Sequence, residues 1–202
     1  MKRYFHFGLV LLFVVLTGCA GSGAYKTLTY LGDTKGKMLP AIPPQGVTPG
    51  PGKAFVYFMR PSSLAVFNHF QIWDSDHYVG WSQANSYFAY ECDAGKHLFI
   101  GVAENKVALD ADFESGKTYY VITNLHMGFI NARMDFTPVT QGSELWKKVE
   151  SGKSDLTYNE VNEFERDKWQ TAKKEEAQQY IAFFMSEEGK PHICKLNKED
   201  GI

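Results

Sequence analysis

Between Lys53 and Val139 the chain is a succession of short apolar runs separated by clusters of turn-forming residues. Aromatic side chains occupy 17 of the 84 positions from Lys53 to Phe136. Short runs of this kind are typical of strands, and the Gly, Asp and Asn clusters between them form tight turns. We therefore expect eight strands, near residues 54–60, 67–73, 78–82, 87–92, 97–104, 107–113, 118–124 and 129–137.

The connections between these strands leave no room for a long crossover helix. Parallel pairing ordinarily needs such a crossover, so the pattern favours antiparallel sheets. The expected fold class is mainly β: an antiparallel β-sandwich of about seven or eight strands over residues 53–142, with a C-terminal α-helix packed on it.

Two of the expected strands, 54–59 and 98–102, are apolar at consecutive positions and should be buried on both faces. Something must cover their second face. The segment 143–202 is the best candidate, although 23 of its 60 residues are charged, against 15 of the 90 from 53 to 142.

Within this segment, Thr157–Glu160 fits a capping box that opens a helix. Gly189 and Pro191 mark the end of that helix. Apolar residues recur between these limits at roughly helical spacing, and they predict a docking face toward one sheet: Val161, Phe164, Trp169, Ala172, Tyr180, Ile181 and Phe184.

The first residues have the form of a secretory signal, in which Lys2 and Arg3 precede an apolar stretch from 7 to 16. That stretch is shorter than the roughly 18–20 residues of a membrane-spanning helix. It ends in Leu16-Thr17-Gly18-Cys19, which resembles the lipobox of bacterial lipoproteins. The resemblance implies a signal peptide at 1–18 and a diacylglycerol on the Cys19 thiol. It also implies an acylated amino terminus, typically carrying palmitate. The alternatives are a secreted protein and a short uncleaved anchor.

Ala20 and Gly21 follow the cysteine, where an Asp would signal inner-membrane retention in a Gram-negative lipoprotein. The resemblance therefore implies the outer membrane, with the folded part in the periplasm. In a Gram-positive source it implies the outer face of the cell membrane. Residues 19–52 are expected to form a tether, since positions 20–52 contain seven Gly and five Pro.

The net charge excludes one class of partner. It is formally -2, and loss of the two basic residues of the signal leaves 19 basic and 23 acidic residues, or -4. A nucleic-acid partner is not expected for such a chain.

Several motifs of the β region resemble a domain of unknown function found in bacterial lipoproteins. They are Arg60-Pro61, Tyr78-Val79-Gly80, the turn Ala94–His97, and Gly116–Val121 with its two tyrosines. The resemblance covers about residues 53–140. It implies a small β-sandwich on a lipid anchor, and it brings no catalytic residue.

Residues that could carry chemistry are few. His69, Asp74, Asp76 and His77 are the candidate metal ligands, but they lack the spacing of known zinc sites. Gly116-Lys117-Thr118 and Gly152-Lys153-Ser154 lack the first glycine of a phosphate-binding loop, and no hydrolase motif is present. We expect no catalytic residue, no cofactor and no metal.

Two further groups of side chains leave alternatives open. Cys92 and Cys194 are a candidate disulfide in an oxidising compartment, the alternative being two free thiols. Six aromatic residues are expected in the core, with a stacking surface for a glycan as the alternative: Trp73, Trp81, Tyr87, Tyr90, Tyr119 and Tyr120.

The sequence thus predicts a non-enzymatic, lipid-anchored module of the cell envelope that binds a protein partner or serves an envelope assembly. One alternative is a module that binds glycan or peptidoglycan. The other is a metal-dependent envelope hydrolase assembled from residues such as His69, Asp74, Asp76 and His77.

Overall fold

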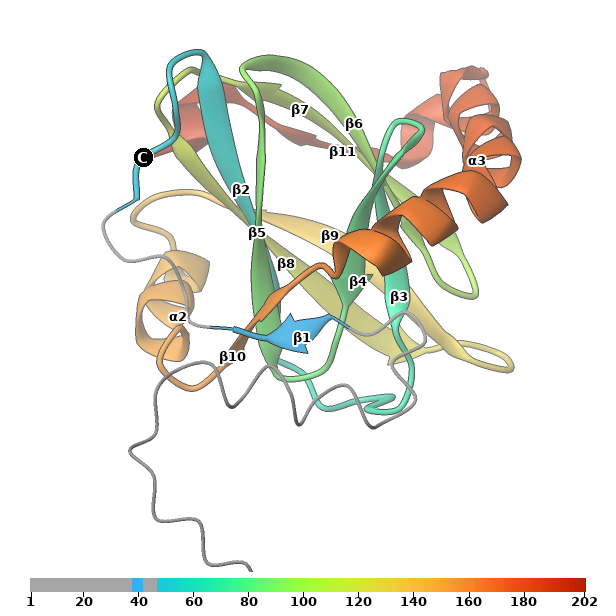
Figure 1. Ribbon diagram of the computed structural model, residues 1–202, viewed down its shortest axis with the longest axis horizontal. Coiled ribbons are helices and arrows are strands. Elements are labelled where there is room, and N and C mark those ends of the chain that lie inside the picture. Colours follow the sequence, from blue (N-terminus) through green and yellow to red (C-terminus); the bar gives the residue numbers. More distant parts are fainter. Residues whose placement is uncertain (1–37, 42–46) are drawn as a thin grey trace, which may run out of the picture. The chain divides into compact units, whose positions relative to one another are not determined.

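The computed structural model describes residues 38–41 and 47–202. It is mainly β, with two mixed sheets (Figure 1). The six-stranded sheet has the order β1-β10-β5-β2-β8-β9, and the five-stranded sheet has the order β11-β7-β6-β3-β4. The strands are β1 (Leu39–Pro40), β2 (Lys53–Arg60), β3 (Phe70–Asp74), β4 (His77–Ser82), β5 (Ser86–Asp93), β6 (Gly95–Val102), β7 (Lys106–Phe113), β8 (Thr118–Met127), β9 (Ala132–Val139), β10 (Thr157–Glu160) and β11 (Ile193–Leu196). The helices are α2 (Glu144–Gly152) and α3 (Glu163–Met185), followed by the short 3-10 helices η2 (Lys190–His192) and η3 (Lys198–Asp200).

The eight predicted strands correspond to β2 through β9. The prediction of purely antiparallel sheets is wrong, because β2 pairs in parallel with β8, β5 with β10, and β7 with β11. Between β2 and β8 the chain passes through the hairpins β3–β4 and β6–β7 of the other sheet. Strands therefore make the crossover for which a helix was assumed to be necessary.

The core lies between the two sheets. On β2, alternate residues such as Val56 and Phe58 face inward and pack with Ile72, Phe99 and Val121. Stacked and edge-on ring contacts fill this space, including Phe58 with Phe99 at a centroid separation of 5.2 Å. An interior built from large aromatic side chains explains why strands as short as these specify a stable body.

The second face of each doubly apolar strand is covered by the C-terminal segment, as predicted. Val149 of α2 packs in a cluster with Met59 and Tyr120, on the outer face of the six-stranded sheet. Ala177 and Phe184 of α3 pack with the cluster that contains Ile100, on the outer face of the five-stranded sheet. Figure 1 shows α3 lying across β3 and β4.

The predicted start of the helix is wrong. Thr157–Glu160 is the strand β10, and Tyr158 lies opposite Tyr87 of β5, with ring centroids 5.2 Å apart. The helix α3 begins three residues later, where the Asn162 side chain accepts hydrogen bonds from the backbone N–H groups of Phe164 and Glu165. No helix among the described residues is long and apolar enough to cross a membrane.

Arg60 organises the loop that joins β2 to β3. Its side chain is 1% exposed and donates from Nη1 to the carbonyls of Asn68 and Ser82, both at 3.0 Å. Its Nη2 donates to the carbonyls of Leu64 at 2.5 Å and Ala65 at 2.9 Å. Burial lowers the pKa of this guanidinium to about 10, so it remains charged at neutral pH. One cation thus binds three carbonyls of the loop and ties the loop to the end of β4 through the fourth carbonyl.

Candidate functional site

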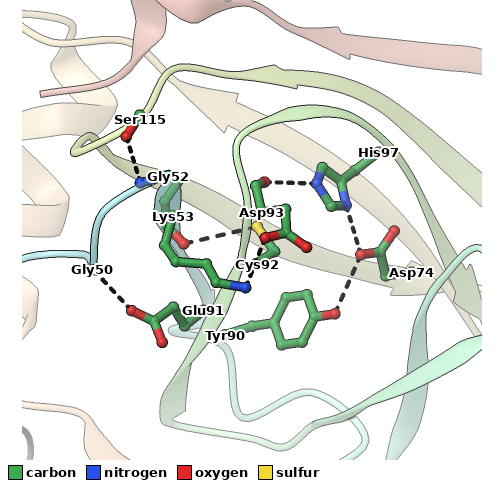
Figure 2. A network of polar contacts seen from close by, with 11 residues as sticks. Gly50, Gly52, Lys53, Asp74, Tyr90, Glu91, Cys92, Asp93, His97 and Ser115 are labelled. Carbon is green, nitrogen blue, oxygen red and sulfur yellow. Dashed lines mark hydrogen bonds and ion pairs between the residues drawn. The ribbon is translucent and has the colours of Figure 1, made fainter.

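A network of polar side chains lies at the end of the body where β5 turns into β6 (Figure 2). Its centre is the pair of Asp74, the last residue of β3, and His97, near the start of β6. The His97 Nδ1 and Asp74 Oδ2 atoms are 2.7 Å apart, and the two side chains are only 15% and 10% exposed. The Tyr90 hydroxyl donates to the same Asp74 oxygen at 3.3 Å. Two neighbouring strands of one sheet, β3 and β6, and β5 of the other sheet therefore bring together three groups found in many acid–base sites.

Both nitrogens of His97 are occupied. Nδ1 faces the Asp74 carboxylate, and Nε2 lies 2.9 Å from the backbone carbonyl of Asp93. Each of these partners accepts hydrogen bonds, so the imidazole satisfies both only as a cation that donates from both nitrogens. Accordingly, the hydrogen bond to Asp74 raises the pKa of His97. A ring held in this way has no lone pair to take a proton from a substrate, which argues for a structural role.

The neighbouring groups are also poorly suited to react. Desolvation by burial raises the pKa of the Cys92 thiol to about 12, and the Asp74 carboxylate adds to the shift. Its sulfur faces the Ala54 carbonyl at 3.8 Å, so the reactive thiolate is disfavoured. Burial likewise raises the pKa of Tyr90.

The outer part of the network ties the segment before β2 to the body. The backbone N–H of Gly50 donates to Glu91 at 3.1 Å, and that of Gly52 donates to Ser115, also at 3.1 Å. Lys53 forms an exposed ion pair with Asp93 at 2.7 Å. These contacts join the ends of strands and the segment before β2.

The candidate metal ligands are not brought together. Asp74 belongs to the His97 pair, whereas Asp76 lies 3.1 Å from His77 and 3.4 Å from Lys174 of α3. The His69 ring packs edge-on against Trp81, with centroids 6.0 Å apart. Among the residues described, no three potential ligands of the His, Cys, Asp and Glu types form a group that could hold a metal ion.

Of the two alternatives for Cys92 and Cys194, a disulfide or two free thiols, the structure has the free thiols. Cys92 lies on β5 and is buried in the core between the sheets, whereas Cys194 lies on β11, at the edge of the other sheet, and is exposed. The two side chains therefore project into different surroundings.

The six aromatic residues considered for glycan stacking belong to the packed interior. Trp73, Tyr87, Tyr119 and Tyr120 are buried, and Trp81 and Tyr90 are half-buried.

The central residue of the network, His97, was not predicted as a site residue. The turn Ala94–His97 was recognised, but its spacing gives no sign that β3 places Asp74 opposite the histidine. Conversely, Cys19 and the signal peptide at 1–18 fall outside the described residues.

The His97 pair makes the stability of the fold depend on pH. A histidine whose pKa is raised by folding stabilises the folded state fully below its unfolded pKa, near 6.5, and loses this contribution as the pH rises through the higher folded value. We expect the free energy of unfolding, measured in urea, to decrease as the pH rises above about 6.5.

The control for this prediction is the exposed pair of His126 and Asp135, whose Nδ1 and Oδ2 atoms lie 3.3 Å apart. His97→Gln should flatten the pH profile, whereas His126→Gln should leave it unchanged. A profile that His97→Gln does not alter would show that another group causes the dependence.

Comparison with known proteins gives no relative: no family model, no curated protein and no solved structure matches this chain, and the resemblance to lipoproteins remains a prediction.

Proposed function

We propose that this protein is a lipid-anchored lipoprotein of the cell envelope, and that its β-sandwich is a non-enzymatic module that binds a protein partner. The lipobox-like Leu16-Thr17-Gly18-Cys19 supports the anchor. In a Gram-negative source, the residues after Cys19 favour the outer membrane with the module facing the periplasm.

The observation that carries the non-enzymatic assignment is the internal pairing of His97 and Asp74. These two residues look most like an acid–base pair, yet the distal His97 nitrogen is held 2.9 Å from a backbone carbonyl. Catalysis by a histidine–carboxylate pair needs that nitrogen free toward a nucleophile or a substrate. The pair therefore stabilises the strands instead.

The helix α3 supplies the candidate surface for the protein partner. It leaves Phe164 in its first turn 75% exposed and Met185 at its end 64% exposed, while Ala177 and Phe184 are buried against the sheet. Large apolar side chains in contact with water are typical anchors of protein interfaces.

Photocrosslinking in intact envelopes tests the partner. A photoreactive phenylalanine analogue at position 164 or 185 should capture one protein in stoichiometric amount. The same analogue at Glu144 of α2, whose side chain is 84% exposed, should not capture it. Equal capture from all three positions, or capture of no protein, would contradict a partner site on α3.

The lipid anchor gives a separate prediction. Protein extracted from membranes should begin at Cys19 and carry the added mass of its acyl chains, measured by intact-mass spectrometry. Cys19→Ser should abolish this mass and prevent stable membrane association. Without acyl chains, only the apolar stretch at 7–16 could hold the protein at the bilayer, and that stretch is too short to span it. A mature protein with an unmodified Cys19 would remove the anchor.

A further inference from the structure

At the end of the body opposite the His97 network, a hairpin tip holds apolar side chains out in water. The connection between β8 and β9 exposes Met127 by 77%, Phe129 by 92% and Ile130 by 81%. Figure 1 shows this hairpin projecting from the rest of the sheet. Exposed large apolar residues that cluster in this way mark interaction surfaces.

The tip is rigid, since the carboxylate of Glu104 in the β6–β7 turn accepts from three consecutive backbone N–H groups. The distances are 2.9 Å from Phe129, 2.7 Å from Ile130 and 2.6 Å from Asn131. Arg133 Nε donates to the same carboxylate at 3.1 Å. Phe129 and Ile130 are therefore presented in a fixed conformation, and little ordering entropy is lost when they are buried.

A second apolar loop lies at the same end. Strand β8 runs parallel to β2, and Ile122 lies opposite Met59, so β8 continues past the end of β2 toward its tip. The loop after β2 begins at that same end, and it leaves Phe67 91% exposed and Val66 48% exposed. The Arg60 side chain holds this loop in place by donating hydrogen bonds to the carbonyls of Leu64 and Ala65.

The charge at this end is unusual for an acidic protein. The segments that form this end, residues 61–70 and 123–134, contain no Asp or Glu, although the whole chain has 23. The acid nearest the tip, Glu104, is neutralised by Arg133 and the three N–H groups. Asp135, at the base of the hairpin, faces His126 at 3.3 Å. Apolar tips without free acids match a bilayer with anionic headgroups, which would repel carboxylates.

We propose that this end of the module, with Phe129 and Ile130 at the hairpin tip and Phe67 on the loop after β2, inserts into the surface of an anionic phospholipid bilayer. A projecting tip that presents two bulky apolar side chains to water fits the interfacial layer of a membrane. The setting rests on the proposed lipid anchor. Residues 20–37 between Cys19 and the described body could span up to about 60 Å when extended, so the anchor permits this orientation. Tethering also makes a weak insertion sufficient, because the bilayer is present at high effective concentration.

The test uses the full lipidated chain reconstituted in vesicles of phosphatidylethanolamine and phosphatidylglycerol. An environment-sensitive fluorophore is attached at Phe129→Cys in a Cys194→Ser background, since Cys92 is buried. The control probe is at Glu114→Cys, in the β7–β8 turn at the opposite end. We expect blue-shifted emission and strong quenching by nitroxide-labelled acyl chains at 129, with neither at 114.

Matched substitutions provide the second readout, with the probe moved to Phe67→Cys. Ile130→Ser should reduce its nitroxide quenching, because burying one large apolar side chain contributes about tenfold or more to bilayer affinity. Phe164→Ser on α3, which also removes an exposed phenylalanine, should not reduce it.

Each outcome decides the inference. Emission at 129 that remains typical of water would overturn it. Shielding at 129 without nitroxide quenching would also overturn it, because the tip would then contact protein. A chain that fails to float with the vesicles contradicts the anchor instead. The probe is then read at raised lipid concentration, where quenching at 129 supports insertion and its absence refutes it.

Discussion

Replacing Arg60 with Met is expected to destabilise the folded state by about 3–5 kcal/mol. The methionine fills a similar volume but donates no hydrogen bond, so three backbone carbonyls of the β2–β3 loop and the carbonyl of Ser82 at the end of β4 lose their partner. Exchanging a buried ion pair for apolar residues is often neutral, because both charges disappear together. At Arg60 the acceptors are backbone carbonyls, which no side-chain substitution removes. The free-energy cost of leaving them without a hydrogen bond therefore remains. Urea unfolding at neutral pH measures the difference.

The control for Arg60 is Lys53→Met, at the other end of the same strand. Lys53 forms an exposed pair with Asp93, and its removal should change stability by no more than about 0.5 kcal/mol. The loss of stability caused by Arg60→Lys should lie between those of Arg60→Met and Lys53→Met. The ammonium keeps the charge, but it cannot donate to four carbonyls as the planar, forked guanidinium does. If Arg60→Met unfolds within about 1 kcal/mol of the native protein, the loop does not depend on the guanidinium.

The strands of the β region could be predicted from the sequence because alternation and turn residues are local signals. The pairing could not. The assumption that parallel strands need a helical crossover failed because the chain between β2 and β8 passes through the hairpins β3–β4 and β6–β7 of the opposite sheet. Strands β10 and β11 were missed for a related reason. They are four residues each, and parallel partners on β5 and β7 specify them more than their own composition does.

The polar centre of the molecule shows the same limit. Asp74 and His97 are 23 positions apart and were considered in separate motifs, a metal-like cluster and a turn. Only the β3–β6 pairing, in which Asp74 lies opposite Phe99, places the carboxylate beside the histidine ring. Residues whose role depends on cross-strand register cannot be recognised by spacing alone.

Asp74→Ala is the second substitution with a large expected effect. It removes the acceptor for both His97 and Tyr90 and leaves a nearly buried imidazole without its carboxylate. Breaking one side of a buried ion pair costs about 3–5 kcal/mol, and we expect about 3 kcal/mol here because the pair retains some contact with water. Urea unfolding below about pH 6 should show the largest loss, since the native pair is fully formed there.

Asp74→Asn separates the charge of the carboxylate from its hydrogen bonds. The amide oxygen can still accept from Nδ1, so the loss at neutral pH should be smaller than for Asp74→Ala. Without the negative charge, however, the largest cause of the raised pKa of His97 is lost and only Asp93 still opposes the effect of burial, so the decrease in stability above about pH 6.5 should become much smaller. If Asp74→Asn keeps the pH dependence of the native protein, the pair is not its source. If the pH dependence weakens or disappears while Asp74→Asn remains more stable than Asp74→Ala, the carboxylate acts both as a charge and as a hydrogen-bond acceptor. The network then has a structural role, in which it holds β3, β5 and β6 together.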